Sequence, residues 1–394
     1  MTPNQLANYA ISALEPDSFD PLEPPADPWP HLAALRSRHP VARFDAPNLS
    51  LVLGYEEART ALRDTATYSS RVRPKKDPAE HTIQSTDPPD HTRLRKIINH
   101  AFALDRVRSW EPRIRAIATE LAEALAAGPA DLVPRFTVPL PVTVISELLG
   151  VPPADRERFK KWSDGMVHAA GGRAENVMGE FRAWAREQIV SRRTSTDPPD
   201  DLLTIVATSE EDGERLDENE AASMVMLLVT AGNETTTNAL GTAIHRLLLD
   251  GDLLTRVRRD RGLIAEVVEE TLRFDPPIPV LPRRATTEAS LDGEAFAAGE
   301  TLLVHLGAAN RDPATFPDPD RFDPERHAAR THIGFGYGAH TCVGAPLARA
   351  EMAIGIDVLL DSFPDLRLAE GREVPQIGFF LLRGPASLWV EGTR

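Results

Sequence analysis

Residues 333–350 read IGFGYGAHTCVGAPLARA and contain the only cysteine of the 394-residue sequence, Cys342. Three glycines lie within six residues of this cysteine: Gly336, Gly338 and Gly344. Backbone without side chains lets a flat ligand approach closely. The apolar pattern from Ala345 to Leu360 predicts a helix, so Cys342 would lie at a helix N-terminus. Free N–H groups and the helix dipole favour a thiolate there, and a thiolate is a good ligand for a soft metal or a haem iron.

The pattern FGYGAHTCVG, followed by Ala345 and Arg349, resembles the haem-binding loop of the cytochrome P450 family. The resemblance implies that Cys342 is the proximal iron ligand of haem b, that Phe335 shields its sulfur and that His340 meets a haem propionate. Gly336 and Gly344 would leave space for the haem.

Two other interpretations of this stretch are weaker. GFGYG could be a dinucleotide-binding loop, but the third glycine and the ribose-binding acid of that motif are not at the required positions. His332, His340 and Cys342 could bind zinc, but three ligands without a second cysteine make a poor structural zinc site.

The composition limits the class of protein. A net charge of -15 argues against nucleic acid or an anionic membrane as the main partner. A single cysteine suits a reducing cytosol, and the first 30 residues have neither a basic region nor a long apolar run. We therefore expect a soluble, cytoplasmic protein that does not bind membranes or nucleic acid.

Local patterns predict a mixed but mainly helical chain. An extended lead-in at 1–30 precedes a helix from His31 to His39, and 41–44 with 49–53 form a hairpin. Segments 379–382 and 387–390 are predicted to be closing strands. The family resemblance implies a single domain over 1–394, mainly α with a smaller β-rich part, folded as a triangular prism around haem.

Two segments contain candidates for binding the haem propionates. His91 and Arg95 are four residues apart on one predicted helix face, which is also compatible with a solvated basic surface. The resemblance implies that both reach the propionates. In the later strand IPVLPRR, Arg284 is the preferred propionate ligand, and Arg283 is the alternative after a shift of one residue.

The longest predicted helix follows a capping pattern at Asp217 and Glu220 and ends near Leu249, about 48 Å at helical rise. It contains AGNETTT at 231–237. The threonines of this stretch are compatible with a plain helix, because a threonine hydroxyl can hydrogen-bond to the preceding turn. The resemblance implies that Ala231 and Gly232 leave space for dioxygen. It also implies that Glu234 and Thr235 relay protons to it.

The segment EETLR resembles the ExxR motif of the family, with Glu270 and Arg273 on one helix face. In the family this pair is buried and completed by a downstream arginine, for which Arg326 of FDPERH is the match. These three residues are assigned to the fold and to haem retention.

Residues 91–115 form a basic segment in an acidic chain, with seven Lys or Arg and two acidic residues. Such a segment suggests an anionic partner, and the resemblance implies an acidic ferredoxin docked on the face from Arg93 to Arg115, with Arg349 nearby.

Substrate-pocket candidates are apolar residues scattered along the chain, beside a long loop at 71–89 that is either functional or a plain linker. They are Ile83, Met226, Val229, Ile278, Val280, Leu281 and Phe379. The implied function is insertion of one atom of dioxygen into an apolar small organic substrate. Electrons would come from NAD(P)H through ferredoxin reductase and ferredoxin. A peroxide-driven peroxygenase and a haem-based sensor or electron carrier are the alternatives, and the Glu234–Thr235 pair argues against both.

Overall fold

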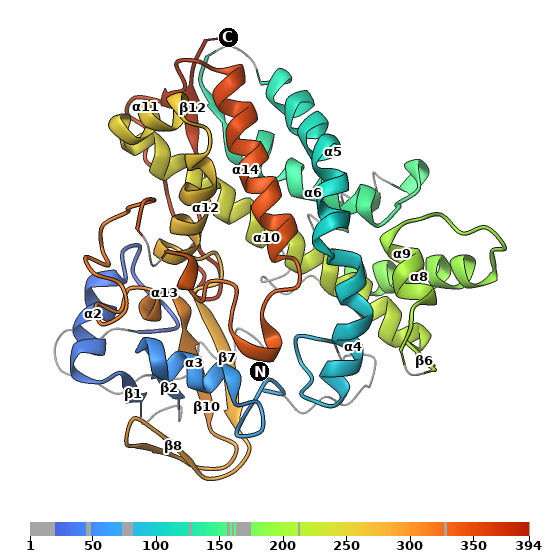
Figure 1. Ribbon diagram of the computed structural model, residues 1–394, viewed down its shortest axis with the longest axis horizontal. Coiled ribbons are helices and arrows are strands. Elements are labelled where there is room, and N and C mark those ends of the chain that lie inside the picture. Colours follow the sequence, from blue (N-terminus) through green and yellow to red (C-terminus); the bar gives the residue numbers. More distant parts are fainter. Residues whose placement is uncertain are drawn as a thin grey trace.

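The computed structural model describes residues 20–44, 49–72, 82–125, 128–155, 158–159, 161–162, 175–211, 213–326 and 329–393 (Figure 1). Helices dominate these residues. Their bounds are α2 Trp29–Arg38, α3 Tyr55–Arg63, α4 Asp90–Asn99, α5 Leu104–Glu123, α6 Pro139–Leu148, α8 Glu175–Thr194, α9 Leu202–Thr208, α10 Glu218–Leu249, α11 Gly251–Arg259, α12 Leu263–Phe274, α13 Leu306–Ala309 and α14 Ala345–Ser362.

The strands are short and lie mainly on one side of the helices in Figure 1. Their bounds are β1 Val41–Phe44, β2 Leu49–Val52, β3 Tyr68–Ser69, β4 Ala130–Asp131, β5 Glu210–Glu211, β6 Glu214–Arg215, β7 Val280–Ala285, β8 Ala289–Leu291, β9 Glu294–Phe296, β10 Thr301–His305, β11 Arg367–Leu368 and β12 Trp389–Glu391.

Helix α10 is the centre of the helical part. Its N-terminus is fixed by the predicted capping box, in which Asp217 Oδ1 accepts from the Glu220 amide at 2.8 Å and Glu220 Oε2 accepts from the Asp217 amide at 3.0 Å. The helix packs against α6, α8, α12 and α14. Most of its side chains are buried in the largest apolar cluster, so any accessible position in its middle is unusual.

The largest sheet has the strand order β1-β2-β10-β7-β3. Strands β1 and β2 pair antiparallel as the predicted hairpin, β10 joins β2 in parallel, and β7 pairs antiparallel with β10 so that Thr301 faces Arg284. This register fixes which face of β7 each arginine occupies, because successive side chains point to opposite faces.

Two boundaries differ from the predictions. Helix α2 begins at Trp29, inside the predicted lead-in, because Pro30 is tolerated in a first helical turn. Residues 379–382 form only an isolated bridge between Phe379 and Leu382, and the final strand begins two residues later than predicted, at Trp389. Among the helices of the described segments, none is long and apolar enough to cross a membrane.

Candidate haem-thiolate site

The cysteine loop is a tight turn before α14. Gly336 and Gly338 both have φ of +75°, a conformation that favours glycine, and the amide of Cys342 donates to the carbonyl of Phe335 at 2.8 Å. A Cβ added at Gly338 would lie 3.1 Å from the Cα of Arg63 in α3. The loop is therefore fixed against α3 as well as closed on itself, and it places the cysteine directly before α14. In Figure 1 the chain before α14 runs between β7 on one side and α4 on the other.

Two opposing influences act on the pKa of the Cys342 thiol. Burial is the larger one and raises the pKa of the thiol, while the amides of Gly344 and Ala345 and the cations of Arg95 and Arg349 lower it. The amides at the start of α14 thus lower the pKa of the thiol as predicted, but burial has the larger effect. A bound metal cation would reverse the balance, since a coordinating thiol is deprotonated. Cys342 nevertheless keeps an exposed surface, so it faces an accessible space.

Helix α10 also has an opening on its surface, near its middle. Ala231 is exposed, and a Cβ added at Gly232 would have no atom within 4 Å. Both residues lie in a helix whose neighbouring turns are buried. This opening is where a ligand could approach the helix backbone.

Glu234 and Thr235 follow the opening, and both are half-buried. The Thr235 hydroxyl donates to the carbonyl of Ala231 at 2.6 Å, as threonines inside helices often do. Because the hydroxyl donates its proton in this bond, its oxygen can still accept a hydrogen bond from another group.

The rings of His91 and His340 are in contact, with centroids 4.1 Å apart and planes tilted by 46°. His91 is buried, its Nε2 has no hydrogen-bond partner among the described residues, and burial lowers its pKa, assisted by the cation of Arg95. A buried polar atom without a partner is costly unless a ligand supplies one. His91 therefore suits a bound acceptor such as a carboxylate.

His340 is already satisfied by the protein. Its Nδ1 lies 3.1 Å from the carbonyl of Ile83, so this nitrogen carries the proton, and its Nε2 lies 3.0 Å from the Ser70 hydroxyl. Burial lowers the pKa of His340 to about 4. In this arrangement both ring nitrogens of His340 already have protein partners, and its contact to a propionate stays a prediction.

The choice between the two arginines of β7 falls on Arg283. Arg283 is 4% exposed, its Nε is buried without a partner among the described residues, and its cation lowers the pKa of His340. Arg284 points to the opposite face, where its guanidinium lies beside Gly299. The alternation of the strand directs Arg283, the alternative to the preferred Arg284, toward the histidine pair.

Arg95 is the fourth group on this side. Its Nε donates to Asn99 Oδ1 at 3.0 Å, and it lies close enough to Cys342 for each to shift the pKa of the other. Arg95, Arg283 and the unpartnered Nε2 of His91 present donors and positive charge on the side of the cysteine loop. This set fits a flat metal complex with anionic side groups, which is a description of haem.

The expected structural trio is in contact. Arg273 donates to both carboxylate oxygens of Glu270 at 2.7 and 2.8 Å, and both side chains are completely buried. Arg326 Nε lies 3.5 Å from Glu270 Oε1, and the Asp323 amide donates to the same oxygen at 2.8 Å. Arg273 also donates to three backbone carbonyls, those of Asn310, Pro319 and Arg321. The trio thus joins α12 to the chain that leads into the cysteine loop.

Glu269, the residue before Glu270, forms a second network that was not predicted from the sequence. Glu269 accepts from Arg349 at 2.5 and 3.1 Å, and its Oε2 lies 3.3 Å from His332 Nε2. These partners lower the pKa of Glu269 to about 2 against the opposing influence of burial. The guanidinium of Arg349 lies 4.6 Å from the ring centre of Phe335, so the network holds the residue expected to shield the sulfur.

The predicted substrate residues separate into two groups. Met226, Val229 and Ile83 are buried, and Leu281 lies beside Gly336 of the cysteine loop. Ile278 is half-buried just before β7. Val280 and Phe379 line a cavity away from the cysteine loop, and their contact with a substrate stays a prediction. Of the loop at 71–89, residues 73–81 lie outside the described part of the chain, and Lys75 and Lys76 are among them.

The basic segment is largely neutralised by acids from elsewhere in the chain. These pairs are Arg93 with Glu220, Lys96 with Glu211, Arg106 with Asp200, Arg113 with Glu147 and Arg115 with Asp357. A local count of charges could not anticipate these partners. Within the described segments there is no group of three or more His, Cys, Asp or Glu suited to a metal ion, which argues against the zinc interpretation.

The cysteine loop and its cationic neighbours fit a haem-thiolate protein. Residues 148–386 match the sequence family described as "Cytochrome P450". The chain is 40% identical over 358 residues to "Cytochrome P450 monooxygenase PikC" of Streptomyces venezuelae, covering 87% of this chain and 85% of that protein. It is 36% identical to "6-deoxyerythronolide B hydroxylase" of Saccharopolyspora erythraea, with 95% and 97% covered.

A solved structure of the cytochrome P450 enzyme CYP109B1 from Bacillus subtilis superposes with a TM-score of 0.85 at 34% identity, covering 93% of this chain and 99% of that one. The chain belongs to the cytochrome P450 family. It is an oxidoreductase of the monooxygenase type with the fold of that family, which confirms the predicted fold class and enzyme class.

Proposed function

We propose that the chain binds haem b through Cys342 and oxidises an organic substrate by inserting one atom of dioxygen. The observation that carries this proposal is the accessible sulfur of the glycine-rich loop, together with the opening at Ala231 and Gly232 in an otherwise buried helix. Haem with a thiolate ligand supplies the electron density that favours cleavage of the O–O bond. His91, Arg95 and Arg283 would hold its propionates, because they combine positive charge with unpartnered donors.

The role of Glu234 and Thr235 is to deliver protons. Cleavage of dioxygen consumes protons inside an apolar pocket, so a positioned acid and hydroxyl are needed. The Thr235 hydroxyl is oriented by its bond to the Ala231 carbonyl, and this leaves its oxygen able to accept from a proton donor. The half-buried Glu234, directly before Thr235 in α10, has a carboxyl suited to exchange protons with solvent.

The proposed electron donors are NAD(P)H, a ferredoxin reductase and an acidic ferredoxin that docks on the face from Arg93 to Arg115. Arg108 supports this face, since it is well exposed and its contact to the exposed Asp105 is long at 3.6 Å. Such exposed pairs are worth little and exchange readily for another carboxylate. Charge reversal at Arg106 and Arg108 should weaken the salt dependence of reduction by ferredoxin, and an unchanged dependence would exclude this face.

The proposed substrate is an uncharged, mainly apolar organic molecule. The candidate substrate residues Met226, Val229 and Ile83 are apolar, and named relatives include "6-deoxyerythronolide B hydroxylase" and "Mycinamicin IV hydroxylase/epoxidase". Hydroxylation or a related oxidation of such a molecule fits these names. We further propose that the chain acts as one domain in the cytoplasm. Screening compounds for the low-spin to high-spin shift would identify the substrate.

The function is tested by comparing Thr235→Ala with Thr230→Ala. Thr230 is a matched control, because it lies in the same helix and bonds in the same way to the Met226 carbonyl at 2.9 Å. With ferredoxin, its reductase and a substrate, Thr235→Ala should keep consuming NADH but release peroxide in place of product. Thr230→Ala should stay coupled. Equal coupling in both variants would remove Thr235 from proton delivery, and product formation with peroxide alone at the wild-type rate would favour a peroxygenase.

A further inference from the structure

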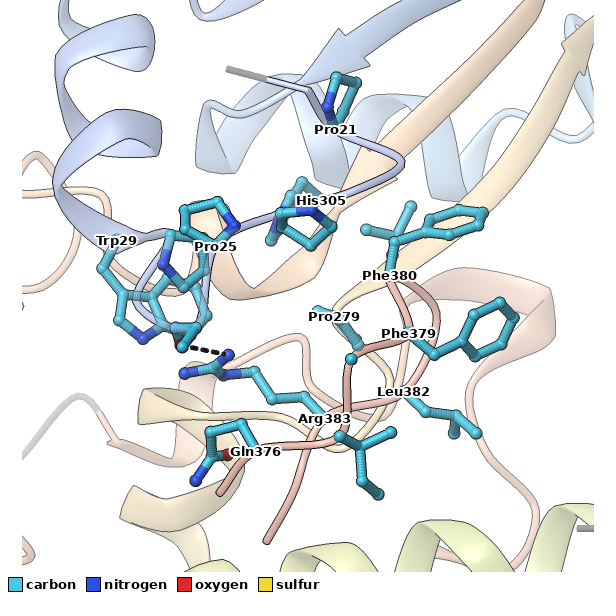
Figure 2. A pocket seen from close by; sticks show the side chains of 16 residues that line it. Pro21, Pro25, Trp29, Pro279, His305, Gln376, Phe379, Phe380, Leu382 and Arg383 are labelled. Carbon is cyan, nitrogen blue, oxygen red and sulfur yellow. Dashed lines mark hydrogen bonds between the residues drawn. The ribbon is translucent and has the colours of Figure 1, made fainter. Parts of the chain in front are cut away.

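A second cavity lies away from the cysteine loop. It is bounded by the proline-rich chain before α2, the start of β7, the end of β10 and the chain from Gln376 to Arg383 (Figure 2). Its volume is about 140 Å³. In Figure 2, Pro25 and Trp29 form one side, Phe379 and Phe380 lie across from them, and His305 lies between.

Strand β7 separates this cavity from the haem-thiolate site. Val280 lines the cavity, whereas Leu281 contacts the cysteine loop at Gly336 and Arg283 lies toward His340. Side chains at alternate positions of a strand point to opposite faces, so the cavity and the haem side are different compartments.

The polar groups of the cavity carry no available charge. Burial lowers the pKa of His305 to about 3, so its ring is neutral. Its Nδ1 accepts from the Ala308 amide at 3.1 Å, which leaves the proton on Nε2. Arg383 is held by Asp275 Oδ1 at 2.5 Å and by the Ala26 carbonyl at 3.1 Å, and this second bond ties the N-terminal chain to the C-terminal chain across the cavity.

We propose that this cavity binds an uncharged apolar molecule about the size of a single six-membered ring, separately from the substrate of the haem site. A cavity of roughly 150 Å³ with apolar walls is known to take up benzene or xenon. Prolines, aromatic residues and aliphatic side chains form most of the walls here, with Gln376 and the paired Arg383 also in the lining, and the neutral His305 carries one N–H that an acceptor group on the ligand can use. A charged ligand would have to be desolvated without a compensating partner.

The test uses the haem-loaded protein and ¹⁹F NMR of fluorobenzene, with 4-fluorobenzoate as the charged counterpart. Fluorobenzene should show a shifted or broadened signal, and 4-fluorobenzoate should not. Ile377→Trp fills the cavity from a half-buried lining position and should abolish the fluorobenzene effect. Val190→Trp is the matched control on the surface of α8 and should leave it unchanged. The band of the reduced carbon monoxide complex shows whether each variant keeps its haem site.

Two results would overturn the proposal: fluorobenzene binding that is insensitive to Ile377→Trp, or equal binding of 4-fluorobenzoate. If Ile377→Trp fails to fold, crystals of the unchanged protein under xenon pressure replace it. A xenon atom between Trp29 and Phe380 supports the cavity as a binding site, and xenon only on the haem side contradicts it.

Discussion

Replacement of Arg283 by glutamine should have opposite effects on the haem-free and haem-loaded proteins. Burial lowers the pKa of Arg283 to about 10, well below its usual value, and the nearby Asp87 opposes this. Each pKa unit corresponds to about 1.4 kcal/mol, so holding this cation in the haem-free protein costs roughly 3 kcal/mol. Arg283→Gln should therefore increase the unfolding free energy of the haem-free protein by up to about this amount.

The haem-loaded protein should respond in the other direction. A charge-assisted hydrogen bond to a propionate contributes roughly 1.5–3 kcal/mol, so its loss should weaken haem binding about 10- to 150-fold. The assay is transfer of haem to an excess of an apo-globin, followed by the Soret absorbance, together with urea unfolding of the haem-free form.

Arg284→Gln is the control, because Arg284 lies one residue away on the opposite face of β7 beside Gly299. It should change neither quantity by more than a few tenths of a kcal/mol. Faster haem loss from Arg284→Gln than from Arg283→Gln would refute the assignment of the propionate ligand.

Three further predictions concern buried carboxyl groups. Glu269→Gln should release the network behind the cysteine loop, so the carbon monoxide complex should lose its red-shifted band at a lower urea concentration. The control Glu266→Gln, on the same helix, breaks only the pair with the exposed Arg330, and it should leave that urea concentration unchanged. Glu270→Gln leaves the buried Arg273 without its carboxylate and should reduce the unfolding free energy by roughly 3–5 kcal/mol, measured by urea unfolding; a loss below 1 kcal/mol would contradict this. Burial raises the pKa of Glu351 from 4.5 to about 8, so the folded protein retains a proton that the unfolded chain loses, and wild-type stability should fall relative to Glu351→Gln as pH rises from about 4.5 to 8. A stability difference that does not vary over that window would be the contrary result.

Much of the fold was predictable because its signals are local. The capping box at Asp217 and Glu220 and the apolar run behind it predicted α10 with its observed bounds. The hairpin of β1 and β2 followed from two short apolar runs. The strand predicted at 379–382 is only a bridge between one pair of residues. Whether such a segment forms a longer strand depends on the chain that packs beside it.

The site was less predictable wherever the answer depended on long-range contacts. The choice between Arg283 and Arg284 required the strand register, which the sequence does not state. Glu269 has no sequence signal of its own, because its partners Arg349 and His332 lie 80 and 63 residues away. The basic segment at 91–115 showed the same limit, since its neutralising acids come mostly from distant elements.

The central claim is that Cys342 is the thiolate ligand of a haem iron. Because it is the only cysteine of the sequence, no other thiolate can replace it within the chain. The direct measurement is the absorbance spectrum of the reduced protein under carbon monoxide, for the wild type and Cys342→Ala. The wild type should show the red-shifted Soret band of a thiolate-bound haem, and Cys342→Ala should lack it. Persistence of that band in Cys342→Ala would contradict the claim.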